Sequence, residues 1–317
     1  MYKYLGDQVS NIWDNLYNKR WEKAQGYSVT CLAMSTEMSL GFQIYSIAKM
    51  YHMSIFVNGS LTNMETWPHC TEKRIEAFEK LEQTFFRKVL KAHSKTPIEA
   101  IYLELGVLPI RYHLMKRRIM YLHTIIQRDN KEITKQVVMA QKEEGRKGDF
   151  YSQAKQDMDA ISLSFEEISV SDKEKLKDLL TNKLKNLAFD RLISKAKKHS
   201  KVNEKSYIDC EGCLHYNDPR FTPDIANLLF KFRTRTYLVK NNFRNNYKNS
   251  DILCPLCLQQ NDDQEHLLRC VKIKESYSGS IDITMGNIFS DDIDILYKAA
   301  KTLKVLDSIR NDLIEES

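Results

Sequence analysis

The sequence predicts a mainly α-helical protein that ends in a small Cys/His-rich motif and a final helix. The 317 residues include only 10 Gly and 6 Pro, which favours a helix-rich chain with few long loops. Apolar residues recur at intervals of three and four along several stretches, as they do on one face of a helix. Ser, Thr and Pro stand where several of these stretches begin, as is typical of helix starts.

The first expected helices lie in the N-terminal third of the chain. Thr71 precedes a stretch, residues 75–89, with apolar side chains at helical spacing, so a helix is expected to start there. Thr96 and Glu99 have the spacing of a capping box, with Pro97 at the first helical position of the next helix.

Residues 111–128 predict an amphipathic helix. The apolar face carries Met115, Ile119, Leu122 and Ile126, and the opposite face carries His113, Lys116, Arg117 and Gln127. We interpret the basic face as solvated. Further on, Gly145 to Gly148 predicts a break, residues 168–177 a polar surface connection, and Ser171 with Glu174 a second capping box.

The segment between Asp224 and Asp251 contains no acidic residue. Its basic residues are Lys231, Arg233, Arg235, Lys240, Arg244 and Lys248, and they alternate with Phe230, Phe232, Tyr237, Phe243 and Tyr247. Cations pair with phosphates and rings stack on bases, so this is the best candidate surface for RNA or DNA. We expect phosphate contacts from Lys231, Arg233, Arg235, Lys240 and Arg244, and base stacking from Phe243 and Tyr247.

The alternative for this segment is an ordinary solvated helix. Thr222 would cap it, Pro223 would take the first position, and an apolar stripe would continue to Val239, with the basic side chains on both sides. Residues 241–249 are rich in asparagine and predict a turn or loop.

Four metal-ligand residues follow at close spacing: Cys254, Cys257, His266 and Cys270. This Cys-Cys-His-Cys (CCHC) pattern suits one tetrahedral zinc ion. Asp262 and Asp263 supply a helix cap, and one helical turn would place His266 and Cys270 on the same face. The alternative is a set of ordinary buried thiols. A closed four-ligand site leaves no position for water, so the zinc is expected to be structural and not catalytic.

The remaining cysteines leave an alternative open. Cys210 and Cys213 could join Cys254 and Cys257 in a four-cysteine site, or bind a second ion with His215, although incidental cysteines are favoured. Cys31 and Cys70 are expected to be core thiols. An odd cysteine count, no apolar N-terminal segment and no membrane-length apolar run predict an intracellular protein, nuclear or cytoplasmic, without a membrane partner.

Phe289-Ser290-Asp291-Asp292 looks like a Phe-x-Asp-Asp polymerase box, but it opens an amphipathic stretch from Ile295 to Leu306. Ser290 as N-cap with acids in the first turn explains this pattern, so no catalytic residue is assigned.

The chain resembles the C-terminal part of the reverse transcriptases of non-LTR (LINE-type) retrotransposons, with Dong-like elements most similar. The motifs that carry the resemblance, in order, are Lys3-Tyr4-Leu5-Gly6, Glu65-Thr66-Trp67, Leu81-Glu82, Phe86-Arg87-Lys88-Val89-Leu90, residues 102–111 (Tyr-Leu-Glu-Leu-Gly-Val-Leu-Pro-Ile-Arg), Arg117-Arg118, Tyr121-Leu122-His123, His199-Ser200-Lys201, Arg233-Thr234-Arg235 and the CCHC motif. Each motif is weak by itself, and their order together is fairly specific.

The resemblance implies the domain organisation. The expected parts are a palm edge with thumb-like helices (1–95), a helical linker region (96–205), a basic aromatic helix and loop (206–250), a CCHC zinc knuckle (251–275) and a C-terminal helical tail (276–317). The family is an RNA-directed DNA polymerase, but its catalytic aspartate pair has no counterpart at the start of this chain. The chain is therefore expected to be inactive alone, to bind RNA or DNA, and to need a palm-containing polymerase chain for catalysis.

Two other functions remain open from the sequence. The chain could be a helical protein-interaction module with a purely structural zinc knuckle, or an open-reading-frame fragment without a selected function. Phosphate binding weakens steeply with salt and apolar docking does not, so salt dependence separates the first alternative from nucleic-acid binding.

Overall fold

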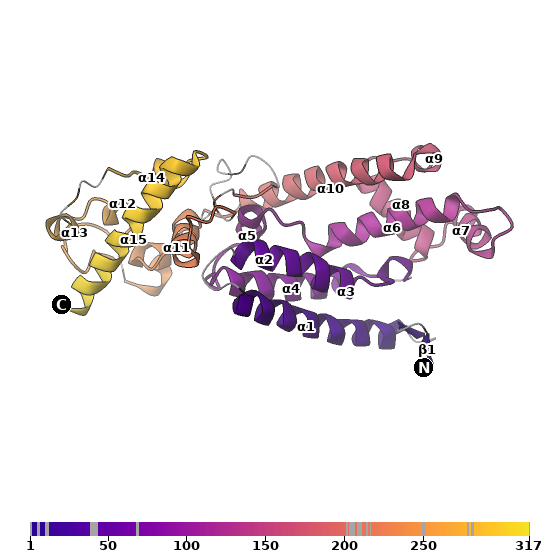
Figure 1. Cartoon of the computed structure of the whole chain (residues 1–317), viewed down its shortest axis with the longest axis horizontal. Coiled ribbons are helices and arrows are strands. Elements are labelled where there is room, and N and C mark those ends of the chain that lie inside the picture. Colours follow the sequence, from indigo (N-terminus) through magenta and orange to yellow (C-terminus); the bar gives the residue numbers. More distant parts are fainter. Residues whose placement is uncertain are drawn as a thin grey trace. The chain divides into compact units, whose positions relative to one another are not determined.

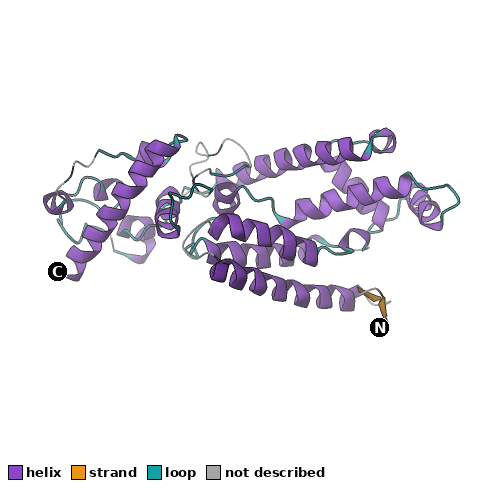
Figure 2. Cartoon of the chain, viewed as in Figure 1, coloured by secondary structure: helices purple, strands orange, loops and turns teal. Residues whose placement is uncertain are grey.

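The computed structural model is mainly α-helical, as the sequence predicts (Figures 1 and 2). It describes residues 2–4, 7–9, 13–38, 44–67, 70–200, 202, 207, 211–213, 215, 217–248, 251–277, 279 and 282–316. Within these ranges the strands are β1 (Tyr2–Tyr4) and β2 (Asp7–Val9), which pair antiparallel with Tyr2 opposite Val9. No helix in the described ranges has both the length and the apolar character needed to cross a membrane.

The chain divides into two compact units. Unit 1 comprises Met1–Glu37, Ile47–Phe86 and Val107–Arg191, and unit 2 comprises Met38–Ser46, Arg87–Gly106 and Leu192–Ser317. The five parts expected from the sequence stay a prediction.

Unit 1 is built from helices of very different length. They are α1 (Trp13–Met38), α2 (Ile44–Tyr51), the π-helix η1 (His52–Val57), α3 (Asn58–Ser60), the 3-10 helix η2 (Met64–Thr66), α4 (Glu72–Val89), α6 (Ile110–Ile126), α7 (Ile133–Glu144), α8 (Phe150–Ala160), α9 (Phe165–Val170) and α10 (Lys173–Ala196). Helices α1, α2, α4 and α10 also contain residues of unit 2. Helix α6 packs against α7, α8 and α9 (Figure 1). Its apolar side chains Ile119 and Leu122 are fully buried, as predicted for this face.

The predicted helix signals of unit 1 have mixed outcomes. Thr71 precedes α4 and its carbonyl accepts hydrogen bonds from the amides of the first turn, which confirms the predicted start. Gly145 ends α7 with a φ of 65°, a left-handed conformation that glycine adopts without strain, so the predicted break is confirmed.

The predicted surface connection at residues 168–177 is wrong. Helix α9 runs to Val170 and α10 begins at Lys173, so only a short link separates them. Asp172, not Ser171, caps α10: its Oδ1 accepts hydrogen bonds from the amides of Glu174 (3.0 Å) and Lys175 (3.2 Å). A carboxylate next to the first turn also complements the helix dipole, an advantage that a serine hydroxyl lacks.

Unit 2 contains α5 and the C-terminal helices. They are α5 (Ile98–Leu105), α11 (Pro223–Arg233), the 3-10 helix η5 (Lys240–Asn246), α12 (Gln264–Leu267), α13 (Val271–Ser276), α14 (Met285–Ile288) and α15 (Ile293–Glu315). Helices α11, α13 and α14 each pack against α15, the long terminal helix that the sequence predicts (Figure 1). Leu229 and Phe232 of α11 and Leu303 and Leu306 of α15 are fully buried and form part of this core.

Gly106, which ends α5, lies where no other residue fits. Its φ is +61°, and a Cβ at this position would lie 2.1 Å from the carbonyl oxygen of Glu211. Because the clash is with backbone, a side chain here would force the two segments apart. The amide of Cys213 donates to the carbonyl of Glu104 (2.9 Å), which fixes the same contact.

Two capping predictions in unit 2 are wrong. Pro97, in an extended conformation, occupies the N-cap position of α5, so Thr96 does not cap this helix. Asp292, not Ser290, caps α15, because its carboxylate accepts hydrogen bonds from the amides of Asp294 and Ile295. The carboxylate of Asp292 is thus engaged in a helix start, which agrees with the non-catalytic interpretation of this motif.

Candidate metal centre and basic segment

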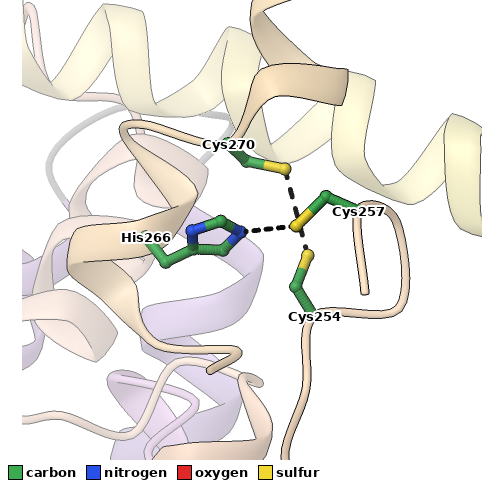
Figure 3. Close-up of side chains that lie close together, drawn as sticks. All are labelled: Cys254, Cys257, His266 and Cys270. Carbon is green, nitrogen blue, oxygen red and sulfur yellow. Dashed lines mark hydrogen bonds between the residues drawn. The ribbon is translucent and has the colours of Figure 1, made fainter. Parts of the chain in front are cut away.

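The first cysteine pair lies in a short hairpin-like loop. The Cys254 amide donates to the carbonyl of Gln260 (2.8 Å), and the Asp262 amide donates to that of Ile252 (2.8 Å). The chain turns between these bonds, where Leu258 has a φ of 54° and its amide donates to the Cys254 carbonyl (3.0 Å). This geometry places the Cys254 and Cys257 sulfurs on the same side of the turn (Figure 3).

The second pair comes from two elements and not from one helical turn. Helix α12 carries His266, and its N-cap Asp263 accepts a hydrogen bond from the His266 amide (2.7 Å). Cys270 lies past the end of α12 and is the N-cap of α13, with a ψ of 125°. The expectation that one helical turn carries both residues is therefore wrong, although their side chains still converge.

The four side chains Cys254, Cys257, His266 and Cys270 point toward a common centre (Figure 3). Their ligand atoms all lie within 4.8 Å of one another. The Cys254 and Cys270 sulfurs are 3.9 Å apart, too far for a disulfide bond, and the Cys257 sulfur lies 3.2 Å from Nε2 of His266. This group can hold one metal ion, which the sequence predicts at these residues.

Backbone hydrogen bonds act on the cysteine sulfurs. Burial raises the pKa of the Cys254 thiol to about 11, although hydrogen bonds from the backbone of Cys257 and Leu256 oppose this rise. Burial also opposes ionisation of Cys257, but hydrogen bonds from the backbone of Gln259 and Gln260, together with those of the Cys254 and Cys270 side chains, lower its pKa. Amides directed at sulfur favour the thiolate, the form that binds a metal.

His266 is oriented by a neighbour that the sequence analysis missed. Its Nδ1 lies 2.9 Å from the side-chain oxygen of Gln260, while Nε2 faces the sulfur of Cys257. A hydrogen bond at Nδ1 fixes the ring with Nε2 available as a ligand. The sequence spacing of Gln260 and His266 does not predict this contact, because the contact depends on how the loop folds.

Of the cysteines that the structure describes, Cys31, Cys70 and Cys213 lie outside this group. Arg233 donates to the Cys213 sulfur (3.3 Å), and burial together with the nearby Glu104 carboxylate raises the pKa of Cys213. Cys210 lies outside the described residues, so whether it binds a metal stays open. Cys31 is fully buried and donates to the carbonyl of Tyr51, which confirms a core thiol, and Cys70 is half-buried.

The basic aromatic segment is not one continuous helix. Helix α11 ends at Arg233, and Arg235 follows in a left-handed conformation with a φ of 50°. The predicted apolar stripe therefore does not continue to Val239 as a helix. Residues 241–246 of the expected turn or loop belong to the 3-10 helix η5, which is kinked at Phe243 (φ −124°, ψ 31°).

The structure gives the expected nucleic-acid residues different environments. Arg235, Arg244 and Tyr247 are exposed, while Lys231 and Lys240 are half-buried. The ring of Tyr247 is therefore accessible to a base. Phe243 is buried beneath the side chains of His93 and Lys95, so its ring is not available for stacking on a base.

Arg233 differs from the other expected phosphate ligands because it is buried in an ion pair. Its Nε donates to Oε1 of Glu104 (2.7 Å), which also accepts a hydrogen bond from Tyr207 (2.7 Å), and its Nη1 donates to the carbonyl of Ile288 (3.1 Å). Burial would raise the pKa of Glu104, but the charges of Arg233 and His215 outweigh it and lower this pKa. Arg233 therefore holds α5, α11 and α14 together, and we do not retain it among the phosphate ligands.

Asp262 connects the metal loop to the basic segment. Its Oδ2 accepts a hydrogen bond from the Lys240 amide (2.9 Å), and its carbonyl accepts one from the Asn241 amide (2.9 Å). Both carboxylate oxygens also pair with Arg310 of α15 (3.1 and 3.2 Å). From the other side, Nζ of Lys240 donates to the carbonyl of Leu253, next to the first metal ligand (3.0 Å). The loop that carries the cysteines thus fixes the start of η5.

Comparison with known proteins finds no match for this chain. The chain matches no protein-family model, no curated protein and no solved structure.

Proposed function

We propose that this chain is a zinc-dependent nucleic-acid-binding fragment of a retrotransposon reverse transcriptase. The observation that carries the proposal is the connection through Asp262, which joins the loop of the Cys/His group to the basic 3-10 helix η5. A metal that orders this loop also orders the cations next to it. Metal binding and phosphate binding then depend on each other.

Zinc is the metal that the donor set favours. Three thiolates and one imidazole are typical of structural zinc sites. Tetrahedral zinc with Zn–S near 2.3 Å and Zn–N near 2.0 Å puts two sulfurs about 3.8 Å apart and a sulfur and a nitrogen about 3.5 Å apart. The distances of 3.9 Å between Cys254 and Cys270 and 3.2 Å between Cys257 and His266 support this fit. Bound zinc would hold the loop together, and the four protein ligands would leave no open position for catalysis.

Four cations of the segment are suited to phosphate: Lys231, Arg235, Lys240 and Arg244. Arg235 and Arg244 are exposed, and each of the two half-buried lysines keeps an ammonium group with several donors. Tyr247 is 43% exposed and supplies a ring on which a base can stack.

The resemblance to non-LTR reverse transcriptases supports the wider assignment. The order of motifs from residue 3 to the CCHC group resembles that of the thumb, linker and knuckle of that family. In this proposal the chain grips RNA or DNA and a palm-containing polymerase chain carries out the catalysis.

Zinc content and the salt dependence of oligonucleotide binding test the proposal together. Metal analysis of the purified chain should give one zinc per chain. Fluorescence anisotropy with labelled single-stranded RNA and DNA should show binding that weakens with salt. Four phosphate contacts predict a slope of log K against log salt of about −2.8, or roughly a 50-fold loss from 50 to 200 mM salt.

Other outcomes identify the alternatives. One zinc per chain without oligonucleotide binding would favour a helical protein-interaction module with a structural zinc knuckle. Binding that does not change with salt would contradict phosphate recognition by these cations.

A further inference from the structure

A second acid-free basic stretch follows helix α4. From Arg87 to Ile98 the chain carries Lys88, Lys91 and Lys95 and no acidic residue. All three lysines are exposed. A short run of lysines at the end of a helix usually interacts with the helix dipole and solvent, so the sequence alone does not indicate a binding role for this stretch.

The structure brings this stretch into contact with η5, although about 150 residues separate them in the chain. Nζ of Lys95 donates to the side-chain oxygen of Asn246 (3.3 Å) and lies 5.6 Å from the centre of the Phe243 ring. The ring of His93 packs against the same phenylalanine, with centroids 4.8 Å apart. Phe243 thus joins the two basic stretches into one surface and does not stack on a base itself.

The loop that carries these lysines has a defined shape. The Ala92 amide donates to the Arg87 carbonyl (2.8 Å) and Lys91 has a φ of 46°, the pattern of a Schellman motif at the end of a helix. The guanidinium of Arg87 then donates to the carbonyls of His93 (3.3 Å) and Thr96 (2.9 Å). Arg87 is therefore used to fix the loop, which leaves Lys91 and Lys95 as its exposed cations.

We infer that Lys91 and Lys95 extend the phosphate-binding surface of η5, so that one nucleic-acid strand contacts both segments. This inference rests on the proposed function and names a second part of the same site. Exposed cations converge from two acid-free stretches, and Tyr247 lies exposed one residue after η5 ends. Neither stretch contains an acidic residue in its sequence.

A neutralised pair of lysines tests the inference in the full-length chain. Lys91→Gln and Lys95→Gln together remove two charges from exposed side chains. The matched control is Lys298→Gln with Lys304→Gln, which removes two charges from exposed positions of α15. Anisotropy with a labelled 20-nucleotide single-stranded oligonucleotide, measured from 50 to 200 mM salt, gives the salt slope of each protein.

With Lys91 and Lys95 added to the four cations, six phosphate contacts predict a wild-type slope of about −4.2. The Lys91/Lys95 variant should then have a slope of about −2.8, while the control keeps the wild-type slope. Lysine acetylation of the wild-type protein, measured by mass spectrometry, gives a second readout that needs no variant. The bound oligonucleotide should protect Lys91 and Lys95 from acetylation. If the wild type binds but this variant has the control's slope and neither lysine is protected, the inference is overturned and the proposed function stands. If the wild type does not bind, both fail.

Discussion

Replacing Asp262 with alanine should separate the metal loop from the basic segment. The side chain of Asp262 is almost fully buried, pairs with the largely buried Arg310, and accepts the amide of Lys240. The alanine variant leaves the Arg310 guanidinium and the Lys240 amide without this acceptor. The four metal ligands are unchanged, so the variant should still bind zinc.

The structure sets the size of the effect. Removing one partner of a buried ion pair costs about 3–5 kcal/mol, mainly because the remaining charge is left uncompensated. The lost hydrogen bond to Lys240 belongs to the same network and does not add in full. Taking about 3 kcal/mol for the local opening of this region, amide exchange should accelerate by roughly 100-fold.

Hydrogen exchange measured by mass spectrometry on zinc-loaded protein tests this prediction. The peptides to compare contain the amides of Lys240, Asn241, Cys254 and Asp262, whose partners lie in this network. Amides of α6, in unit 1, should keep their protection. Oligonucleotide binding should weaken only in proportion to the fraction of molecules in which η5 is no longer ordered.

Asp312→Asn is the control, because Asp312 is exposed on α15. Asp262→Asn should fall between the control and the alanine variant, since the amide keeps one acceptor oxygen but loses the charge. Unchanged exchange in the Asp262→Ala variant would refute the reasoning that this carboxylate links the loop to η5.

Three further predictions concern the site and the core of unit 2. Cys270→Ser should abolish stoichiometric zinc binding and Cys210→Ser should not, measured by metal analysis after dialysis; equal loss from both would show that the ligand set is wrong. Gln260→Ala should weaken zinc binding about 10–100-fold in competition with a chromophoric chelator, because the imidazole loses its orienting partner, and an unchanged affinity would argue against this role. Glu104→Gln should destabilise unit 2 by about 3–5 kcal/mol by leaving the charge of Arg233 buried, seen as a lower thermal midpoint in circular dichroism. The pKa of Glu104 is lowered from 4.5, so the stability that its charge contributes is present above pH 4.5 and is lost as the pH falls through the lowered pKa. The difference in thermal midpoint between wild type and Glu104→Gln should therefore shrink at low pH. A difference that persists unchanged below the lowered pKa would contradict this assignment.

Local sequence patterns predicted the helical content and the metal group well. The apolar periodicity after Thr71 and in residues 111–128 identified α4 and α6, because burial of one face dominates such helices. The CCHC spacing identified the group at residues 254–270, because short spacers leave few ways to arrange four ligands.

Contacts between distant segments could not be predicted from these patterns. Arg233 looks like a basic residue of an amphipathic helix, yet its partner Glu104 lies 129 residues earlier in the chain. The roles of Phe243 and Asp262 likewise depend on segments that only the fold brings together. The helix cap was misassigned at Thr96, because the neighbouring Pro97 occupies the cap position. It was also misassigned at Ser290, because the nearby Asp292 caps the helix.

The most direct test of the central claim is the affinity for a single-stranded oligonucleotide, measured on one protein preparation in three states. These states are the zinc-loaded protein, the same protein after zinc removal, and the protein after zinc has been restored. Salt concentration and pH stay fixed, and metal analysis accompanies each step. If zinc orders the loop that holds Lys240 and η5, affinity should fall when zinc leaves and recover when it returns. An affinity that stays the same while zinc leaves would show that the Cys/His group does not support nucleic-acid binding.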